Sequence, residues 1–440
     1  MKSITLTRRA FLGSTAAMSL AMTTACGGSS SGSGAKAMTF LNEETDPPIL
    51  NFITGAVERY KKQTGVSVSL SQKAIGDLRQ LFSSVQAGDA FDLSTASYSD
   101  VTYLGPDLLT QFDTMMEEAA GGIDNFMESG LILDDGHYYG FPYNINNIGM
   151  YYRSDRLAEV GVAVPKTWDE LKTLLVKLDG AGMPGITQPI SATAATSDVG
   201  TELLWSNGVE LFDEDENVIL EDSEMMAKCI DCLDFLKELQ PYFVKGMESV
   251  DYGDIVKSFI TGTTSMAPYS GRIIDTIEYD AQELSDKFAF EAFPTPEAGM
   301  TPASGYDVNY WLIPKSAESA ELAMDFLSWF VKEEFIGYLL TGPFNMQPPL
   351  KSIYEDPAWA GAKVFKKYPE ARKTLDKMAL GDGYRAGGLW VQPPLDGVKK
   401  EAMFSENIIP NMFQMVTIGG ETSKEAVQKA AEQLRAIASS

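Results

Sequence analysis

The chain has 440 residues and a formal net charge of −26, and it contains one histidine and three cysteines. So acidic a protein is repelled by nucleic acid and by anionic lipid, which argues against both as partners. Zinc sites favour His and Cys ligands, so we expect no metal and no cofactor, and a Ser-His-Asp enzyme would depend on His137 alone. The length exceeds one ordinary core and predicts two or more lobes.

The N-terminal segment has the features of an export signal. Residues 10–25 carry no charge but are fewer than the roughly 20 mainly apolar residues that a spanning helix needs. Arg8 and Arg9 precede this short apolar run, and small residues end it, which favours an export signal over a buried helix. The stretch TRRAFL resembles a twin-arginine signal, and TTAC resembles a lipobox with threonine in place of the usual leucine. We therefore expect removal of residues 1–25 and lipidation of Cys26.

Residues 26–36 are rich in glycine and serine and predict a flexible tether. They contain GSSSG, which matches a hydrolase nucleophile elbow, but that motif requires a strand before it and a helix after it. A tether supplies neither, so we discard the match. The N-terminal features together predict an exported protein that a lipid holds at the extracytoplasmic face of the cell membrane.

Strand-like and helix-like patterns alternate after the tether. AMTFLN, VSVSLSQ and FDLSTAS are typical of strands, and the stretches between them, ILNFITGAVERYKKQTG and DLRQLFSSVQAGDA, are typical of helices. This alternation predicts an α/β fold with a parallel sheet. Ligands of such sheets bind beyond the carboxyl ends of the strands, which lie here near 42–46, 72–75 and 95–100.

The rest of the chain gives a hairpin signal and several helices. Asp135-Gly136 predicts a hairpin that leaves His137 exposed. Thr167 and Glu170 form a capping box at the start of a helix. MTPASGYDVNYWLIPKS predicts a loop that runs into a strand. Further helices are predicted over 222–240, 252–262, 317–340 and 422–438.

Cys229 and Cys232 form a C-x-x-C within a stretch whose apolar residues recur with helical spacing. We interpret them as two thiols on the buried face of a helix. A local disulfide in an exported protein and a thioredoxin-type redox site stay open as alternatives.

The order of elements resembles a known family. The resemblance is carried by NEETDP, FDLSTASYSD, DGHYYGFPYNINNIGMYYRSDRLAEVGVAVPKTWDEL, FITGTTSMAPYSGRIIDTI and YWLIPKSAESAELAMDFLSWFV, in this order and at this spacing. Together they are similar to the extracellular solute-binding proteins of carbohydrate ABC importers, which are related to maltose-binding proteins. The resemblance runs from about residue 38 to the C-terminus.

The resemblance implies a two-lobed periplasmic-binding-protein-like fold of class II, with two α/β lobes joined by a hinge that the chain crosses several times. We expect an N-terminal lobe that combines residues 37–145 with 270–312. The C-terminal lobe would then combine residues 146–269 with 313–440. The ligand would bind in the cleft and close the lobes by a hinge motion.

Sugars present hydroxyl groups and apolar C–H faces, so a sugar site combines aromatic rings with carboxylates and amides. By resemblance and by position, we expect the ligand to contact loop residues at strand ends and hinge crossings. These are Glu43, Glu44, Asp46, Ser97, Tyr98, Tyr143, Asn144, Trp205, Tyr269, Gly271, Arg272, Gly305, Tyr306, Asp307, Asn345, Arg385 and Trp390. Arg272 and Arg385 leave an acidic sugar open, since a guanidinium binds a carboxylate through two hydrogen bonds.

The function that the resemblance implies is binding without catalysis. A monomeric, lipid-anchored receptor would capture a sugar or oligosaccharide and deliver it to the transmembrane subunits of an ABC permease. Two alternatives stay open at this point. One is a glycan-acting enzyme of the cell envelope with paired carboxylates, and the other is a receptor for a different solute, such as a polyamine or ferric ion.

Overall fold

The computed structural model describes residues 36–73, 91–127, 130–387, 399, 402–404 and 406–439. Five sequence predictions lie outside these residues: the export signal, the lipidation site Cys26, the tether up to residue 35, the helix over 77–90 and the ligand residue Trp390. Within the described ranges, no helix combines the length and the apolar character needed to cross a membrane.

The first sheet contains most of the expected parallel pattern. Strand β1 pairs in parallel with β2 and β3, and β11 runs antiparallel between β3 and β6. The parallel pairs confirm the strand–helix–strand prediction, and they bring the carboxyl ends of β1 and β3 to one edge. The strands, in spatial order, are β2 (Ser67–Gln72), β1 (Ala37–Asn42), β3 (Leu93–Ser97), β11 (Tyr306–Leu312) and β6 (Phe141–Asn147).

The second sheet is smaller and follows the first directly in the chain. Strand β6 ends at Asn147, and β7 begins at Gly149, so Ile148 joins the two sheets. β7 pairs antiparallel with both of its neighbours. The strands are β8 (Met266–Tyr269), β7 (Gly149–Arg153) and β9 (Phe288–Glu291). Two short pairs complete the strands: β4 (Leu133–Asp134) with β5 (His137–Tyr138), and β10 (Ala303–Ser304) with β12 (Arg385–Ala386).

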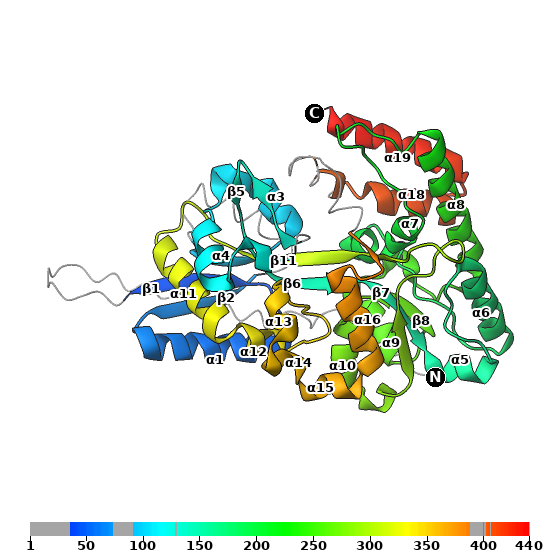
Figure 1. Cartoon of the computed structure of the whole chain (residues 1–440). Helices are drawn as coiled ribbons and strands as arrows, with labels where there is room; N and C mark the ends of the chain where they lie inside the picture. The colour runs from blue at the N-terminus through cyan, green and yellow to red at the C-terminus, as the bar shows by residue number, and fades with distance from the viewer. Residues whose placement is uncertain are drawn as a thin grey trace, which may run out of the picture. The chain divides into compact units, whose positions relative to one another are not determined.

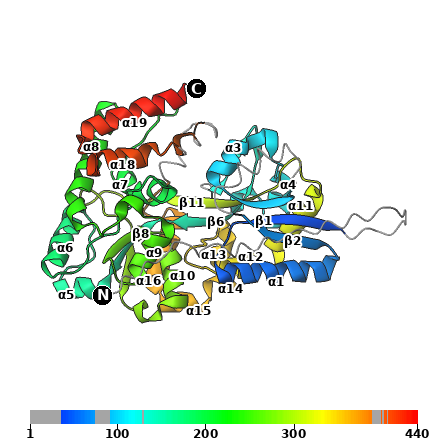
Figure 2. The same ribbon diagram turned by 180° about the vertical axis from the view of Figure 1, so that it is seen from behind.

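Helices cover both sheets. Figures 1 and 2 show α1, α11 and α12 beside the first sheet and α5, α9 and α16 beside the second, while α19 packs against α8 and α18. The helices are α1 (Pro47–Thr64), α3 (Tyr98–Leu108), α4 (Asp113–Ala120), α5 (Ser154–Val160), α6 (Trp168–Gly180), α7 (Glu202–Ser206), α8 (Ser223–Leu239), α9 (Tyr252–Ile260), α10 (Arg272–Asp280), α11 (Ala320–Glu333), α12 (Phe335–Leu339), α13 (Lys351–Glu355), α14 (Pro357–Ala360), α15 (Lys363–Lys367), α16 (Pro369–Leu380), α18 (Ile408–Thr417) and α19 (Ser423–Ala438). A π-helical turn, η3 (Thr196–Gly200), precedes α7.

An aromatic cluster joins the first sheet to its helices. The Trp311 ring on β11 stacks on Tyr143 of β6, with ring centroids 4.9 Å apart. Tyr338 and Phe330 pack against the same indole from the helix side. All four side chains are buried. Burial of such large rings is the main driving force for packing helices on this sheet.

Several local predictions are confirmed. Thr167 forms the predicted capping box at the start of α6. The helix predicted over 422–438 is α19, and Thr422 caps it. Cys229 and Cys232 are free and fully buried on α8, which confirms two buried thiols and contradicts the local disulfide. The helix predicted over 317–340 is instead two helices, α11 and α12, which separate at Glu334.

The distribution of segments between the two sheets differs from the expected lobe boundaries. Residues 270–312 were expected in the first lobe, yet β9 pairs with β7 of the second sheet and α10 packs against α9. Conversely, residues 313–440 were expected in the second lobe, yet α11 packs against α4 and β1. The reason is backbone pairing. β9 forms its hydrogen bonds with β7, and nothing in the side-chain pattern of β9 distinguishes the edge of β7 from the edge of another strand.

Candidate functional site

A cavity of about 420 Å³ lies where residues from both sheets meet. This volume falls in the range typical of small-molecule sites. Segments that follow β1 and β3 form one wall, and segments beside β8, η3 and α7 form another. The cavity is lined by Glu43, Glu44, Thr45, Ser97, Tyr98, Ser99, Asp100, Tyr143, Asn146, Ile148, Ala194, Asp198, Val199, Thr201, Glu202, Tyr252, Tyr269, Ser270, Arg272, Gly305, Tyr306, Asp307, Asn309, Asn345 and Phe404.

Two glutamates enter the cavity at the carboxyl end of β1. The Glu43 N–H donates to Thr95 Oγ1 at 3.0 Å, and the Glu43 carboxylate forms an ion pair with Lys73 at 2.8 Å. Glu44 Oε1 accepts a hydrogen bond from the Tyr143 hydroxyl at 3.0 Å. Burial raises the pKa of Glu44 to about 7, although Arg272 and the Tyr143 hydroxyl act in the opposite direction. Glu44 therefore changes charge near neutral pH.

Ser97 belongs to the cap of α3. Its Oγ accepts a hydrogen bond from the Asp100 N–H at 3.2 Å, and the Asp100 carboxylate accepts one from the Ser97 N–H at 3.0 Å. This capping box fixes the end of β3 and places Tyr98 and Ser99 at the cavity wall. The stretch after a parallel strand thus supplies ring and hydroxyl groups, as the strand-end rule predicts.

Two acids on the opposite wall come from η3 and α7. Asp198 accepts a hydrogen bond from the Tyr252 hydroxyl, and burial together with the charge of Asp307 raises its pKa. The Glu202 carboxylate accepts the Gly305 N–H at 3.1 Å, and burial raises the pKa of Glu202 to about 8. The segments 198–202 and 305–307 therefore lie side by side with their carboxyl groups close together.

Arg272 connects the two walls. Its guanidinium forms an ion pair with Asp46, which precedes α1. In the next turn of α10, the Asp275 carboxylate accepts the Asn345 N–H at 2.9 Å and the Phe344 N–H at 3.3 Å. Burial raises the pKa of Asp275 to about 8. This carboxyl group holds the loop that carries Asn345 to the cavity.

The structure brings most of the predicted ligand residues together. Those that line the cavity are Glu43, Glu44, Ser97, Tyr98, Tyr143, Tyr269, Arg272, Gly305, Tyr306, Asp307 and Asn345. They come from stretches more than 300 residues apart in the sequence. Tyr143 differs from the others, because its side chain is fully buried. Its hydroxyl contacts the cavity wall through a hydrogen bond to Glu44.

Five predicted residues lie away from the cavity lining, each for a physical reason. Asn144 accepts a hydrogen bond from the Asn309 amide at 2.9 Å within the first sheet. Trp205 is buried under Arg385, whose guanidinium carbon lies 3.7 Å from the centre of the indole. Gly271 approaches Phe344 so closely that a Cβ would overlap its carbonyl oxygen. Asp46 is occupied by Arg272.

Sequence reasoning missed the contribution of residues 194–202 and Tyr252. Asp198, Glu202 and Tyr252 line the cavity, but the stretch SATAATSDVGTE shows neither a strand period nor a helix period. A π-helical turn is rare and often marks a functional site, yet no local pattern identifies it in advance. Asp251, by contrast, caps α9 and so places Tyr252 at a recognisable helix start.

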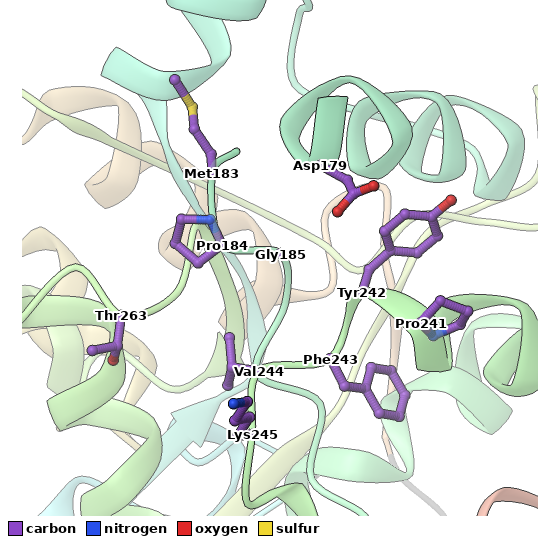
Figure 3. Close-up of a pocket in the computed structure, with 10 residues that line it drawn as sticks. All are labelled: Asp179, Met183, Pro184, Gly185, Pro241, Tyr242, Phe243, Val244, Lys245 and Thr263. Carbon is purple, nitrogen blue, oxygen red and sulfur yellow. The ribbon is translucent and has the colours of Figure 1, made fainter. Parts of the chain in front are cut away.

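A second hollow of about 320 Å³ lies away from this cavity. Figure 3 shows its walls: Asp179 near the end of α6, the stretch Met183–Gly185, the stretch Pro241–Lys245, and Thr263. No predicted ligand residue is among them. Across the described part of the chain, no group of three or more His, Cys, Asp or Glu side chains is placed to hold a metal ion.

Two sheets with helical layers and a cavity between their strand ends define a two-lobed α/β binding protein. A sequence profile described as "Bacterial extracellular solute-binding protein" matches residues 55–373, and the chain belongs to this family. An arabinooligosaccharide-binding protein of Halalkalibacterium halodurans is 24% identical over 372 residues, which cover 80% of this chain and 76% of the relative.

Solved structures support the same fold. A maltose-bound MalE3 of T. maritima has a TM-score of 0.76 at 16% identity, and the match covers 92% of this chain and 100% of the MalE3 chain. A solute-binding protein of Thermotoga lettingae, bound with α-D-tagatose, has a TM-score of 0.75 at 18% identity, with the same two coverages. The class II binding-protein fold expected from the sequence is therefore confirmed.

Proposed function

We propose that this solute-binding protein is the receptor of an ABC importer and captures a sugar or oligosaccharide as a monomer. The observation that carries the proposal is the cavity, whose wall combines tyrosine rings, carboxylates and amides from both sheets. Rings cover the apolar faces of a sugar, and carboxylates and amides bind its hydroxyl groups. Relatives whose names specify arabinooligosaccharides support the same ligand class.

We propose that the two lobes follow the sheets, in place of the boundaries expected from the sequence. The first lobe would combine the described residues of 36–147 with residues 306–355, and its strands β2, β1, β3, β11 and β6 form the first sheet. The second lobe would combine residues 149–291 with residues 369–387 and the described residues of 399–439. A ligand that contacts both lobes favours the closed state, and closure presents the loaded receptor to the permease.

The N-terminal features complete the proposal. A twin-arginine signal would export the receptor, and lipidation of Cys26 would hold it at the extracytoplasmic face of the membrane. The glycine- and serine-rich stretch 26–36 would then act as a tether of adjustable length. This arrangement keeps the binding domain close to a permease in the same membrane.

A thermal-shift screen followed by calorimetry tests the ligand class. A ligand that binds only the folded state raises the unfolding midpoint. We expect at least one saccharide from a panel of malto-oligosaccharides, arabino-oligosaccharides and monosaccharides to raise it. Spermidine and ferric citrate serve as controls for other solutes. A shift with either of these and with no saccharide would contradict the proposal.

A chromatographic assay tests the absence of catalysis. The purified protein is incubated with the oligosaccharide that gives the largest thermal shift, and the products are separated by chain length. We expect the oligosaccharide to be recovered unchanged. Steady release of shorter sugars would identify a glycan-acting enzyme instead.

A further inference from the structure

The acids on the cavity wall outnumber the cations. Glu44, Asp198, Glu202 and Asp307 line the cavity, and Arg272 is the single lysine or arginine among the described lining residues. None of the four acids forms an ion pair with a lysine or arginine in the described part of the chain, whereas Arg272 pairs with Asp46. The wall therefore carries more acidic than basic groups, and a cationic ligand would favour their ionised forms.

Glu202 is the buried acid of this wall that most clearly lacks an ion-pair partner. The residue is 2% exposed, and its Oε2 accepts the Gly305 N–H at 3.1 Å. In the described ranges, Oε1 accepts no hydrogen bond. The nearby Arg385 donates to the Trp205 carbonyl oxygen and stacks on the Trp205 ring instead of pairing with Glu202. Burial makes Glu202 costly to ionise although the charge of Arg385 acts in the opposite direction, so a cation in the cavity would stabilise the ionised carboxylate.

The other two acids lie next to Glu202. Asp198 precedes Glu202 by four residues in the chain. Asp307 lies two residues after Gly305, whose N–H donates a hydrogen bond to Glu202. The negative charge of Asp307 raises the pKa of Asp198, second only to burial. Two like charges this close repel each other unless a proton or a cation lies between them.

We propose that the ligand is a saccharide with a protonated amino group, and that this ammonium group binds among Asp198, Glu202 and Asp307. The proposal rests on the sugar-binding function proposed above and names its ligand class. Tyr252 and Tyr269 line the same cavity with their ring centroids 6.3 Å apart, and aromatic rings near a cation attract it. An acidic sugar, which the sequence left open, is disfavoured because both guanidinium groups are already engaged.

Matched sugars that differ only in charge test the ligand class. Calorimetry compares glucosamine, N-acetylglucosamine and glucose, then their β-1,4-linked dimers, then galactosamine with galactose and mannosamine with mannose. We expect at least one amino sugar to bind about tenfold or more tightly than its hydroxyl and acetamide partners, because hydrogen bonds to charged groups are the stronger kind.

The outcomes separate this proposal from the function beneath it. Equal or tighter binding of the neutral partners, or binding of neutral arabino- or malto-oligosaccharides alone, would overturn the amino-sugar ligand and leave sugar binding intact. Binding of spermidine without any saccharide would overturn both. No binding of any saccharide at millimolar concentration would also overturn both.

Charge-removing variants test the residues. Glu202→Gln and Asp307→Asn keep the shape of the side chain, and each should weaken binding of the best amino sugar about tenfold or more while leaving any neutral partner nearly unchanged. Glu58→Gln on the exposed face of α1 removes the same charge far from the cavity and should change neither affinity. A Glu202→Gln variant with undiminished affinity for the amino sugar, in a protein that unfolds cooperatively, would overturn the assignment.

The pH dependence provides an independent readout. The acidic groups that line this cavity are Glu43, Glu44, Asp100, Asp198, Glu202 and Asp307. The basic groups nearby are Arg272, Arg385 and Lys73, which pairs with Glu43. Burial raises the pKa of Glu202 to about 8 in the empty cavity, so an ammonium ligand must displace protons. Its affinity should rise from pH 5.5 to pH 8, with proton release in calorimetry. A neutral sugar bound by protonated carboxyl groups would show the opposite trend, which would contradict the proposal.

Discussion

The Tyr143 hydroxyl donates a hydrogen bond to Glu44 Oε1 at 3.0 Å, while its ring stacks on Trp311 in the core of the first sheet. One side chain thus connects the buried aromatic cluster of the lobe to a carboxyl group on the cavity wall. Tyr143 has no exposed surface, so its role is to position Glu44 and not to cover the ligand.

We predict that Tyr143→Phe keeps the fold but loses this bond. The hydroxyl lowers the pKa of Glu44, so its removal should raise that pKa further and cost about 1 kcal/mol in the free energy of unfolding. Tyr143→Ala should cost about 3–5 kcal/mol, because it leaves a cavity beside Trp311. Urea denaturation measures both. Tyr242→Phe is the control, since its hydroxyl makes no hydrogen bond in the described ranges, and an equal loss in both phenylalanine variants would contradict the prediction.

The free energy of unfolding should fall as the pH rises towards 8, and ionisation of Glu202 should account for part of this fall. Its pKa of about 8 in the folded state lies above the ordinary value of 4.5, so between these two values the folded state binds more protons than the unfolded state. The free energy of unfolding therefore decreases with pH across this window. Glu202→Gln cannot ionise, and it should gain about 1–3 kcal/mol over the native protein at pH 8.

Urea denaturation at pH 5.5 and pH 8 checks this difference. Glu58→Gln should follow the native protein at both values, since Glu58 is exposed. If Glu202→Gln loses as much stability as the native protein between the two values, then Glu202 ionises normally in the fold.

The Arg272–Asp46 ion pair should contribute little energy but should bias the lobes towards closure. Both side chains are about one-third exposed, so solvent screening limits their coupling to about 0.2–1 kcal/mol. A double-mutant cycle with Arg272→Met and Asp46→Asn measures that coupling. X-ray scattering of the ligand-free protein should show a larger radius of gyration in Arg272→Met. Arg59→Met breaks the pair with Glu334 inside one lobe and should leave the radius unchanged; an increase there would undermine the interpretation.

The lipid anchor can be tested by cell fractionation. Cys26→Ala should move the mature protein from the membrane fraction to the released fraction, because no acyl chain can attach. Ser29→Ala in the same tether is the matched control and should stay with the membrane. Replacement of Arg8 and Arg9 by lysine should trap the precursor inside the cell. Retention of Cys26→Ala in washed membranes would rule out this anchor.

Features with a local chemical cause could be predicted from the sequence. The capping boxes at Thr167 and Thr422 are hydrogen bonds between residues three apart, so their pattern is visible in a short window. The glutamates after β1 were found for a similar reason, since a parallel strand ends in polar residues at the ligand edge.

Features that depend on contacts between distant parts of the chain could not be predicted from the sequence. Glu202 and Gly305 are 103 residues apart, and Glu202 lies in a short helix after a π-helical turn, so neither the contact nor its burial leaves a local period. The assignment of residues 270–312 to the first lobe was wrong for a related reason. β9 joins the second sheet through backbone hydrogen bonds, which any sequence can form.

The contact between Gly305 and Glu202 gives the last prediction. A Cβ at Gly305 would overlap Glu202 Oε1, the far end of a flexible side chain. The three heavy atoms nearest to this Cβ position all belong to the Glu202 carboxyl group, and none is a backbone atom. Gly305→Ala should therefore fold, displace the Glu202 carboxyl group from the Gly305 N–H, and cost about 1–3 kcal/mol in the free energy of unfolding, with weaker ligand binding.

Glu202→Ala should suppress this cost, because it removes the group that the new methyl group meets. In that background, Gly305→Ala should cost less than about 0.5 kcal/mol, which gives a clear coupling energy in a double-mutant cycle. Gly253→Ala on α9 is the control, since nothing lies within 4 Å of its Cβ position, and it should stabilise the helix by about 0.5–1 kcal/mol. Additive costs of Gly305→Ala and Glu202→Ala would mean that the two residues do not act through this contact.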